Sequence, residues 1–341
     1  MQINKNYFKL ATIFFPIFLI VYGNQNAYGL HALNLYENPF STLNSEQWVQ
    51  ESPIQFFIGY FINFFVSNTL YTHWIVVILG FIYFFISTIC FDHLYYKNYS
   101  ILKIFYFTPL FLIFFSWMGK PDPFTVGSVL LLVAFNSNKF LSFTFTLLMV
   151  FSHPQIALIH FILLKFLKIY EFKTPHYISI VFSYLTYYFY FIQLEPFEGR
   201  YDVISQELDR VFKTIFTNSL AGLISLFMWL WVIIFFSKVY LNKRFFISFF
   251  IIFSVSFFTL DHTRIFIQLS IPLIIYLSNN HEFNRVFYKF FDNRSMYILG
   301  LFQLQKRGDG RIVDGINYYE IEFFRVFLNN ILNLINKLPF I

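Results

Sequence analysis

Apolar and polar positions divide most of the chain into long hydrophobic segments separated by short polar turns. Many segments approach the roughly 17–25 apolar residues that cross a bilayer as a helix, and they are continuous rather than alternating as in a barrel strand. The pattern therefore predicts an all-α, polytopic integral membrane protein with about ten transmembrane helices. These helices are predicted at residues 10–22, 74–91, 104–118, 124–135, 140–151, 155–167, 177–194, 219–236, 245–260 and 265–277.

The positions of Lys and Arg predict how these helices are oriented. Lys5 and Lys9 precede the first segment, and no Lys or Arg occurs from residue 10 to residue 96. Because positive residues concentrate in cytoplasmic loops, both the N-terminus and the C-terminus are predicted to be cytoplasmic. The compact polar turns with His, Asp or Arg then fall on the outer face. The first segment also fits a signal peptide, but the many later spans favour a transmembrane helix.

Three further segments are predicted to be helices that do not cross the membrane. Residues 53–66 are short for a span and are interpreted as an interfacial or re-entrant helix on the outer face. The alternative, a full span there, would place Lys97 and Lys103 outside. Residues 204–216 and 320–338 have amphipathic spacing. The chain is therefore divided into a transmembrane domain, residues 1–278, and a cytoplasmic tail, residues 279–341, with an amphipathic helix.

Composition supports a membrane protein and excludes several other classes. Hydrophobic residues make up 57% of the 341 residues and charged residues 12%, against roughly 25% charged in soluble domains. The net charge of +6 follows the topology, so it does not indicate nucleic-acid binding. Cys90 is the single cysteine, which excludes an intrachain disulfide. No cofactor is predicted, because the chain has no glycine-rich phosphate loop, and a divalent metal has no support from ligand spacing.

Ionisable residues at the ends of apolar helices are the candidates for chemistry, because charge at membrane depth is costly. Asp122 lies between Pro121 and Pro123, where it is either a site residue or a helix N-cap. Arg264 closes the turn of residues 261–264, where its guanidinium is suited to a phosphate or to a local pair with Asp261.

Two further candidates come from another outer turn and from the first outer loop. His153, in Ser152-His153-Pro154, is either a structural histidine or a residue that binds phosphate or carries a proton. The loop of residues 24–52 carries His31 and Glu37, and most such loop carboxylates only solvate a surface.

Three segments, in this order, resemble the GT-C superfamily of membrane glycosyltransferases. Residues 24–35, which read NQNAYGLHALNL, are similar to that family's first outer loop. Residues 119–123, GKPDP, look like its Pro-Asp-Pro turn, and residues 264–272 resemble the start of a late span. The likeness covers roughly residues 1–275 as spaced patches. It departs from the family at Asn24, Gln25 and Asn26, where an acidic residue is usual, so either another carboxylate is the base or the protein does not catalyse.

The resemblance implies transfer of a sugar from a polyprenyl-phosphate-linked donor to a glycan or lipid acceptor on the non-cytoplasmic face. The AT-rich amino-acid composition, together with a surface-glycan function, favours a bacterial inner-membrane protein that contacts membrane lipid, and no nucleic-acid partner is expected. The base that the resemblance implies is Asp122, with Glu37 second. The residues expected to bind the substrate phosphate are Arg264, His262, Lys120 and His153, with Asp261 and His31 in support.

Three alternatives to a transferase stay open. A surface-polysaccharide polymerase or ligase is expected to have Arg-rich outer loops, and the predicted outer loops carry few arginines: Arg200, Arg210 and Arg264. A transporter or flippase is expected to have mid-span charges or broken helices in matched halves. A non-catalytic scaffold subunit agrees with the departure at residues 24–26.

Overall fold

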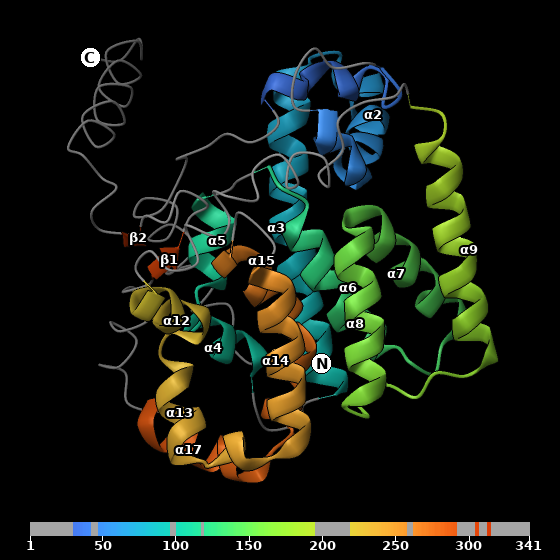
Figure 1. Cartoon of the computed structure of the whole chain (residues 1–341). Helices are drawn as coiled ribbons and strands as arrows, with labels where there is room; N and C mark the ends of the chain where they lie inside the picture. Colours follow the sequence, from blue (N-terminus) through green and yellow to red (C-terminus); the bar gives the residue numbers. More distant parts are fainter. Residues whose placement is uncertain are drawn as a thin grey trace, which may run out of the picture.

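The computed structural model describes residues 30–41, 47–95, 100–116, 119–194, 219–257, 262–291, 304–306 and 312–314. These residues are almost entirely helical (Figure 1). The predicted helices at 10–22, 204–216 and 320–338 lie outside them. The elements are η1 Leu30–Tyr36, η2 Gln47–Glu51, α2 Ile54–Val66, α3 Thr69–Leu94, α4 Ile101–Tyr106, α5 Leu110–Ser116, α6 Asp122–Ala134, α7 Lys139–Ser152, α8 Pro154–Phe166, α9 Thr174–Phe191, α12 Ser219–Phe227, α13 Leu230–Phe236, η3 Val239–Leu241, α14 Lys243–Phe257, α15 His262–Leu269, α16 Ile271–Ser278, α17 His281–Phe291, β1 Leu304–Lys306 and β2 Ile312–Asp314.

Helix α3 is the one described helix that is long and apolar enough to cross a membrane. Its 26 residues correspond to about 39 Å at 1.5 Å per residue, which exceeds the hydrocarbon core of a bilayer. The sequence predicted a helix over 74–91, and α3 extends beyond both ends of that range. Its N-cap is Asn68, whose side chain accepts a hydrogen bond from the Tyr71 amide at 3.0 Å.

The predicted short helix at 53–66 is confirmed as α2, and it is separate from α3. Ser67 ends α2 in the left-handed conformation, with a φ of 52°. One face of α2 is buried, whereas Phe61 and Phe64 are 69% and 83% exposed. Gly59 lies on the buried face, where an added Cβ would overlap the ring of Tyr36, so only glycine allows α2 to pack this closely on η1.

Three predictions of one continuous helix were wrong, because each segment forms two short helices. Residues 104–118 form α4 and α5, residues 219–236 form α12 and α13, and residues 265–277 form α15 and α16. Pro109 and Pro272 account for two of the breaks, since proline has no N–H to donate within a helix. At the third break Met228 has a positive φ of 49°.

The carbonyl groups released by these prolines find other donors. Pro272 leaves the Gln268 carbonyl without its helical partner, and His160 Nε2 donates to that carbonyl at 2.8 Å. Near Pro109, the Thr108 hydroxyl donates to the Phe105 carbonyl at 2.7 Å. Both breaks are therefore satisfied internally, which agrees with their burial.

The expected helical fold is confirmed for the described residues, apart from one short pair of strands. Strands β1 and β2 form an antiparallel pair in which Gln305 is opposite Val313. Each strand has three residues. Gly308 and Gly310 between them in the sequence are typical of a hairpin connection.

The central helices pack through a continuous apolar core. Helix α6 packs against both α3 and α7, and α7 packs against α9. Gly127 of α6 faces α3, where an added Cβ would lie 2.7 Å from Tyr83 and 2.8 Å from Ser87. The core extends as far as α17, since the Phe291 ring stacks on Phe107 with centroids 3.9 Å apart.

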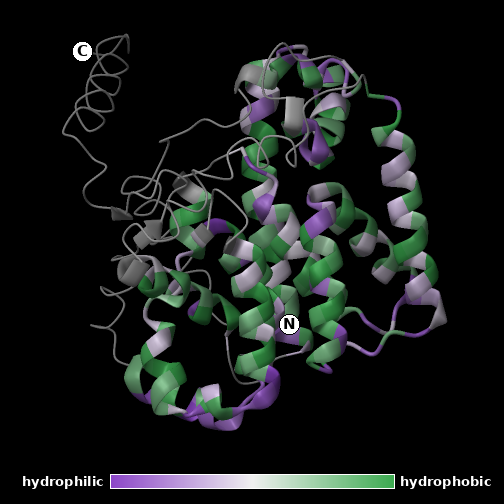
Figure 2. Ribbon diagram, in the orientation of Figure 1, coloured by the Kyte–Doolittle hydropathy of each residue, from purple (hydrophilic) through white to green (hydrophobic). Residues whose placement is uncertain are grey.

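Polar and charged connections gather at one end of the molecule. The α8–α9 connection contains Lys168 and Lys173, and the α13–α14 connection contains Lys238. Both connections lie at the lower end in Figure 1, and Figure 2 shows hydrophilic residues there. Helix α2 and the start of α3 lie at the opposite end.

Candidate functional site

Four polar side chains meet in the interior, and we call them the Asp122 cluster: Ser52, Asp122, His153 and Arg264. Arg264 donates from Nε to Asp122 Oδ2 at 2.7 Å and from Nη2 to Asp122 Oδ1 at 2.6 Å. His153 Nε2 lies 3.1 Å from the same Oδ1. His153 Nδ1 lies 3.0 Å from Ser52 Oγ. All four side chains are buried.

Local sequence explains how Asp122 reaches the cluster. Gly119 has a φ of 95°, a conformation that favours glycine, and it turns the chain into α6. Pro121 is the N-cap and Pro123 stands in the first turn, where its missing N–H costs nothing. Asp122 is the first residue of α6, so its carboxylate is at the helix N-terminus, which favours negative charge.

The other three members also lie at or beside helix ends. His153 is extended between α7 and α8, with a φ of −156°, and Pro154 opens α8. Arg264 is in the first turn of α15, and Ser52 precedes α2. Arg264 and Asp122 are 142 positions apart in the sequence, so the fold rather than local sequence brings them together.

Tyrosines of α9 hold the segment that carries Ser52. The Tyr187 hydroxyl donates to the Glu51 carbonyl at 3.1 Å, and the Tyr190 hydroxyl donates to the Gln50 carbonyl at 3.2 Å. Tyr184 donates to the Pro154 carbonyl at 2.6 Å, next to His153. Their spacing of three residues places the three hydroxyls along one side of α9.

Charge within the cluster is balanced when His153 is neutral. The Asp122 carboxylate and the Arg264 guanidinium form a bidentate pair, the geometry in which Arg binds carboxylates most strongly. If His153 Nε2 carries the proton, it donates to Asp122, and the Ser52 hydroxyl donates to Nδ1. The result is a hydroxyl–imidazole–carboxylate chain, an arrangement that is able to pass a proton.

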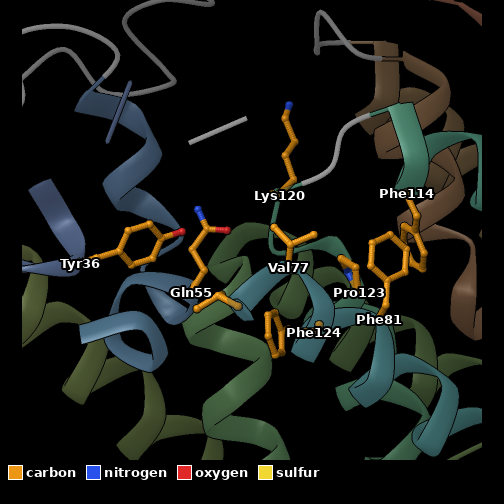
Figure 3. Close-up of a pocket in the computed structure, with 11 residues that line it drawn as sticks. Tyr36, Gln55, Val77, Phe81, Phe114, Lys120, Pro123 and Phe124 are labelled. Carbon is orange, nitrogen blue, oxygen red and sulfur yellow. The ribbon is translucent and has the colours of Figure 1, made fainter. Parts of the chain in front are cut away.

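A second polar group lines a narrow cleft beside Lys120, which we call the Lys120 cleft. Tyr36, Gln55 and Lys120 supply its polar side chains (Figure 3). The cleft encloses about 300 Å³ when its open mouth is counted, and its closed part is the size of one water molecule. The apolar lining residues are Val76, Val77, Gly80, Phe81, Phe114, Gly119, Pro123 and Phe124.

Tyr36 is held in this cleft by a buried histidine. The Tyr36 hydroxyl and His73 Nδ1 lie 2.8 Å apart, and both side chains are buried. Burial raises the pKa of the Tyr36 phenol above its ordinary value, so the phenol keeps its proton. His73 Nε2 has no hydrogen-bond partner among the described residues.

The structure brings together some of the candidates that the sequence suggested. Asp122, His153 and Arg264 belong to one cluster, and Lys120 lines the neighbouring cleft. Glu37 directly follows η1 and is exposed, so it is not one of the buried side chains of the Asp122 cluster. Asp261 and the side chains of His31 and His262 lie outside the described part of the chain. The roles assigned to all these residues remain predictions.

Sequence reasoning missed several residues that the fold places at these sites. Ser52 carried no signal beyond standing before Pro53. His73 does carry a signal in the sequence. Burying an imidazole next to an apolar segment costs free energy unless the imidazole has a hydrogen-bond partner. Tyr36 and Gln55 are ordinary in a chain with 24 tyrosines, and nothing in the sequence distinguished them.

Comparisons with known proteins do not add to these observations. The chain matches no family model, and neither the curated proteins nor the solved structures include a match. Within the described ranges, no group of three or more His, Cys, Asp or Glu side chains is placed to hold a metal ion.

Proposed function

We propose that this chain is a polytopic membrane glycosyltransferase. It transfers a sugar from a polyprenyl-phosphate-linked donor to a glycan or lipid acceptor on the non-cytoplasmic face of a bacterial inner membrane. One observation carries the proposal. Three polar turns that hydropathy assigns to one face of the membrane, at residues 119–123, 152–154 and 261–264, contribute Asp122, His153 and Arg264 to one cluster. A reaction centre at the outer ends of helices requires that such separate turns meet.

Exposed apolar side chains support a membrane around the helices. Soluble proteins rarely expose large contiguous apolar surfaces, because their contact with water is unfavourable. The helices of this chain expose many such side chains in α2, α3, α9 and α14, among them Phe61, Phe64, Ile78, Ile82, Ile86, Ile178, Val181, Phe182, Leu185, Phe189, Phe246 and Phe250. Lysines gather at the opposite end from α2, which agrees with a cytoplasmic lower end.

The proposed reaction is a displacement at the anomeric carbon of the donor. The acceptor hydroxyl oxygen forms a bond to that carbon, and the bond from the carbon to the phosphate oxygen breaks. Its electron pair leaves with the polyprenyl phosphate, and the hydroxyl proton passes to a carboxylate. Asp122 is the proposed base, and Arg264 is the proposed cation that stabilises the departing phosphate.

The pairing of Asp122 with Arg264 defines the first step of this scheme. Both carboxylate oxygens accept hydrogen bonds from Arg264, so Asp122 is occupied before substrate binds. A phosphate offers Arg264 the same bidentate geometry with three acceptor oxygens. In the proposed cycle Arg264 exchanges Asp122 for the donor phosphate. The released carboxylate, still bound by His153, then accepts the acceptor proton.

The test is a comparison of lipid-linked saccharides by mass spectrometry. Cells carry the wild-type gene, its deletion, or the variant Asp122→Asn. The matched control is Asp92→Asn. Asp92 is a buried carboxylate near the C-terminal end of α3, outside the Asp122 cluster, and it accepts a hydrogen bond from the Ile101 amide at 2.9 Å. We expect the deletion and Asp122→Asn to accumulate the same incomplete glycan and Asp92→Asn to behave as wild type. Unchanged glycans in the deletion strain would rule out the proposal.

A second candidate function, a non-catalytic subunit that keeps the fold, has one observation in its favour. The Asp122 cluster is closed and balanced in charge, as a purely structural ion pair is. This alternative predicts that Asp122→Asn matches wild type in any assay once its membrane level is restored. Accumulation of complete single repeat units would instead identify a polymerase or ligase.

A further inference from the structure

We propose that the connection between α13 and α14 lies in the headgroup region of the cytoplasmic leaflet, where it binds anionic phospholipids. The inference goes beyond the proposed function: it uses the membrane placement of the helices, and it does not depend on sugar transfer. We call this surface the η3 patch. It combines three cations with three exposed apolar side chains: Lys238, Lys243, Arg244, Phe236, Tyr240 and Leu241.

The apolar side chains of the η3 patch are open to their surroundings. Phe236 is 65% exposed, Leu241 is 71% exposed and Tyr240 is 40% exposed. The turn that carries them is closed by hydrogen bonds, since the Asn242 amide donates to the Val239 carbonyl at 2.9 Å. Val239 itself is buried, so it anchors η3 to the core. The exposed side chains therefore belong to an ordered turn of the chain.

The charge of the η3 patch is positive and is not offset within its own helices. Residues 219–257, all of them described by the structure, contain three cations and no Asp or Glu. Helix α17 packs against α13. The one carboxylate of α17, Glu282, pairs with Arg285, and Lys289 is a further exposed cation on that helix. Helix α17 therefore adds to the positive charge of this region rather than neutralising it.

The η3 patch lies at the end of the molecule that the topology assigns to the cytoplasm. The α13–α14 connection and α17 lie at the lower end in Figure 1, opposite α2, and Figure 2 shows hydrophilic residues there beside hydrophobic helices. Ser52 of the Asp122 cluster stands just before α2, at the other end. An anion bound at the η3 patch is therefore separate from any substrate of the Asp122 cluster.

Neither water nor hydrocarbon suits this combination of side chains. Contact of large apolar side chains with water is unfavourable, and an ammonium group in the hydrocarbon core is costly. At the headgroups, Phe236 and Leu241 reach the acyl chains, while the flexible stem of Lys238 brings its ammonium group to the phosphates. Each Lys or Arg near an anionic leaflet strengthens the association about fivefold. Three cations without a carboxylate therefore favour anionic over zwitterionic phospholipids.

The α8–α9 connection, at the same end of the molecule, provides a matched comparison. Lys168 is exposed there with a φ of 57°, and Lys238 is exposed in the η3 patch with a φ of 54°. Glycine suits this backbone conformation better than lysine does, so a change to glycine removes one charge at either position without strain. Glu171 stands three residues after Lys168, and its carboxylate offsets the charge of that connection. Lys168→Gly is therefore the control for Lys238→Gly.

The test measures which lipid lies against the η3 patch in the full-length protein. A fluorophore is attached at Phe246→Cys in a Cys90→Ser background, because Phe246 is 60% exposed and lies one helical turn after Lys243. The labelled protein is placed in phosphatidylcholine vesicles that contain increasing fractions of brominated phosphatidylglycerol or brominated phosphatidylcholine. Quenching by bromine reports contact with each lipid.

We expect half-maximal quenching at a fraction of phosphatidylglycerol at least about tenfold lower than that of phosphatidylcholine. Lys238→Gly should lower this preference at least about threefold, and adding Lys243→Gln and Arg244→Gln should bring it below about twofold. Lys168→Gly should leave it unchanged. Salt at about 1 M should reduce the preference of the wild type, because it screens exposed charges.

Three results would overturn the inference: equal quenching by the two lipids, equal losses in the two glycine variants, or quenching by neither lipid, which would place the patch outside the bilayer. Displacement of phosphatidylglycerol by soluble glycerol phosphate would also overturn it, by showing a site for a soluble anion.

The transfer assay separates this inference from the proposed function. If the wild type transfers sugar but shows no preference for phosphatidylglycerol, the lipid assignment fails alone. If the preference depends on Lys238 but deletion of the gene changes no glycan, the glycosyltransferase proposal fails alone.

Discussion

Removing one partner of the buried Asp122–Arg264 pair should destabilise the protein far more than removing both charges. Arg264→Met leaves the Asp122 carboxylate buried with only His153 beside it. Breaking a buried pair in this way costs about 3–5 kcal/mol, on the order of a hundredfold or more in the folding equilibrium. In the double variant Asp122→Asn, Arg264→Met, neither charge remains, so we expect at least about 2 kcal/mol of that loss to be recovered.

The assay is unfolding of purified protein in mixed micelles with increasing dodecyl sulfate, followed by tryptophan fluorescence. Each single variant and the double variant complete a thermodynamic cycle. The control is Arg285→Met, because Arg285 pairs with Glu282 on the surface of α17. Exposed pairs contribute about 0–1 kcal/mol, so this change should have little effect. If the losses in the single variants simply add in the double variant, the two side chains are not coupled and the account of the cluster is wrong.

Three further predictions concern packing and hydrogen bonds. His160→Leu should cost about 1–3 kcal/mol by leaving the Gln268 carbonyl without a donor, and Pro272→Ala in that background should recover part of the melting temperature by restoring a helical N–H. Gly127→Val should lower the melting temperature through overlap with Tyr83, and Tyr83→Ala should partly suppress the loss. Tyr187→Phe should cost about 1 kcal/mol by removing the bond to the Glu51 carbonyl, whereas Tyr188→Phe, on the exposed side of α9, should leave the unfolding midpoint unchanged.

Hydropathy was sufficient to locate helices but not to locate their interruptions. The segments at 124–135, 140–151 and 155–167 are confirmed as α6, α7 and α8, because each is a continuous apolar stretch between polar turns. A hydropathy window does not register the loss of one N–H at Pro272, which divides α15 from α16. The donor that compensates for it, His160, is 108 positions away from Gln268, and only the fold shows that they meet.

Three of the four members of the Asp122 cluster were predictable from the sequence, but their contacts were not. Asp122, His153 and Arg264 were recognised because placing an ionisable side chain at the membrane end of a helix costs free energy. Local sequence suggested Asp261 as a partner for Arg264, and Asp261 lies outside the described residues. The partner that the described residues show is Asp122, which is 142 positions away. Ser52 was not identified, because a serine before a helix is common and its contact with His153 is 101 positions distant.

Reconstitution tests the central claim, transfer of a sugar from a lipid phosphate, most directly. Purified wild-type protein, Asp122→Asn and Asp92→Asn are placed in liposomes that contain polyprenyl-phosphate-linked sugars and lipid-linked acceptors extracted from the native membrane. The measurement is the release of free polyprenyl phosphate together with an acceptor heavier by one sugar. We predict both products with wild type and Asp92→Asn and neither with Asp122→Asn. Equal product from wild type and Asp122→Asn, or none from wild type that complements the deletion strain, would contradict the account.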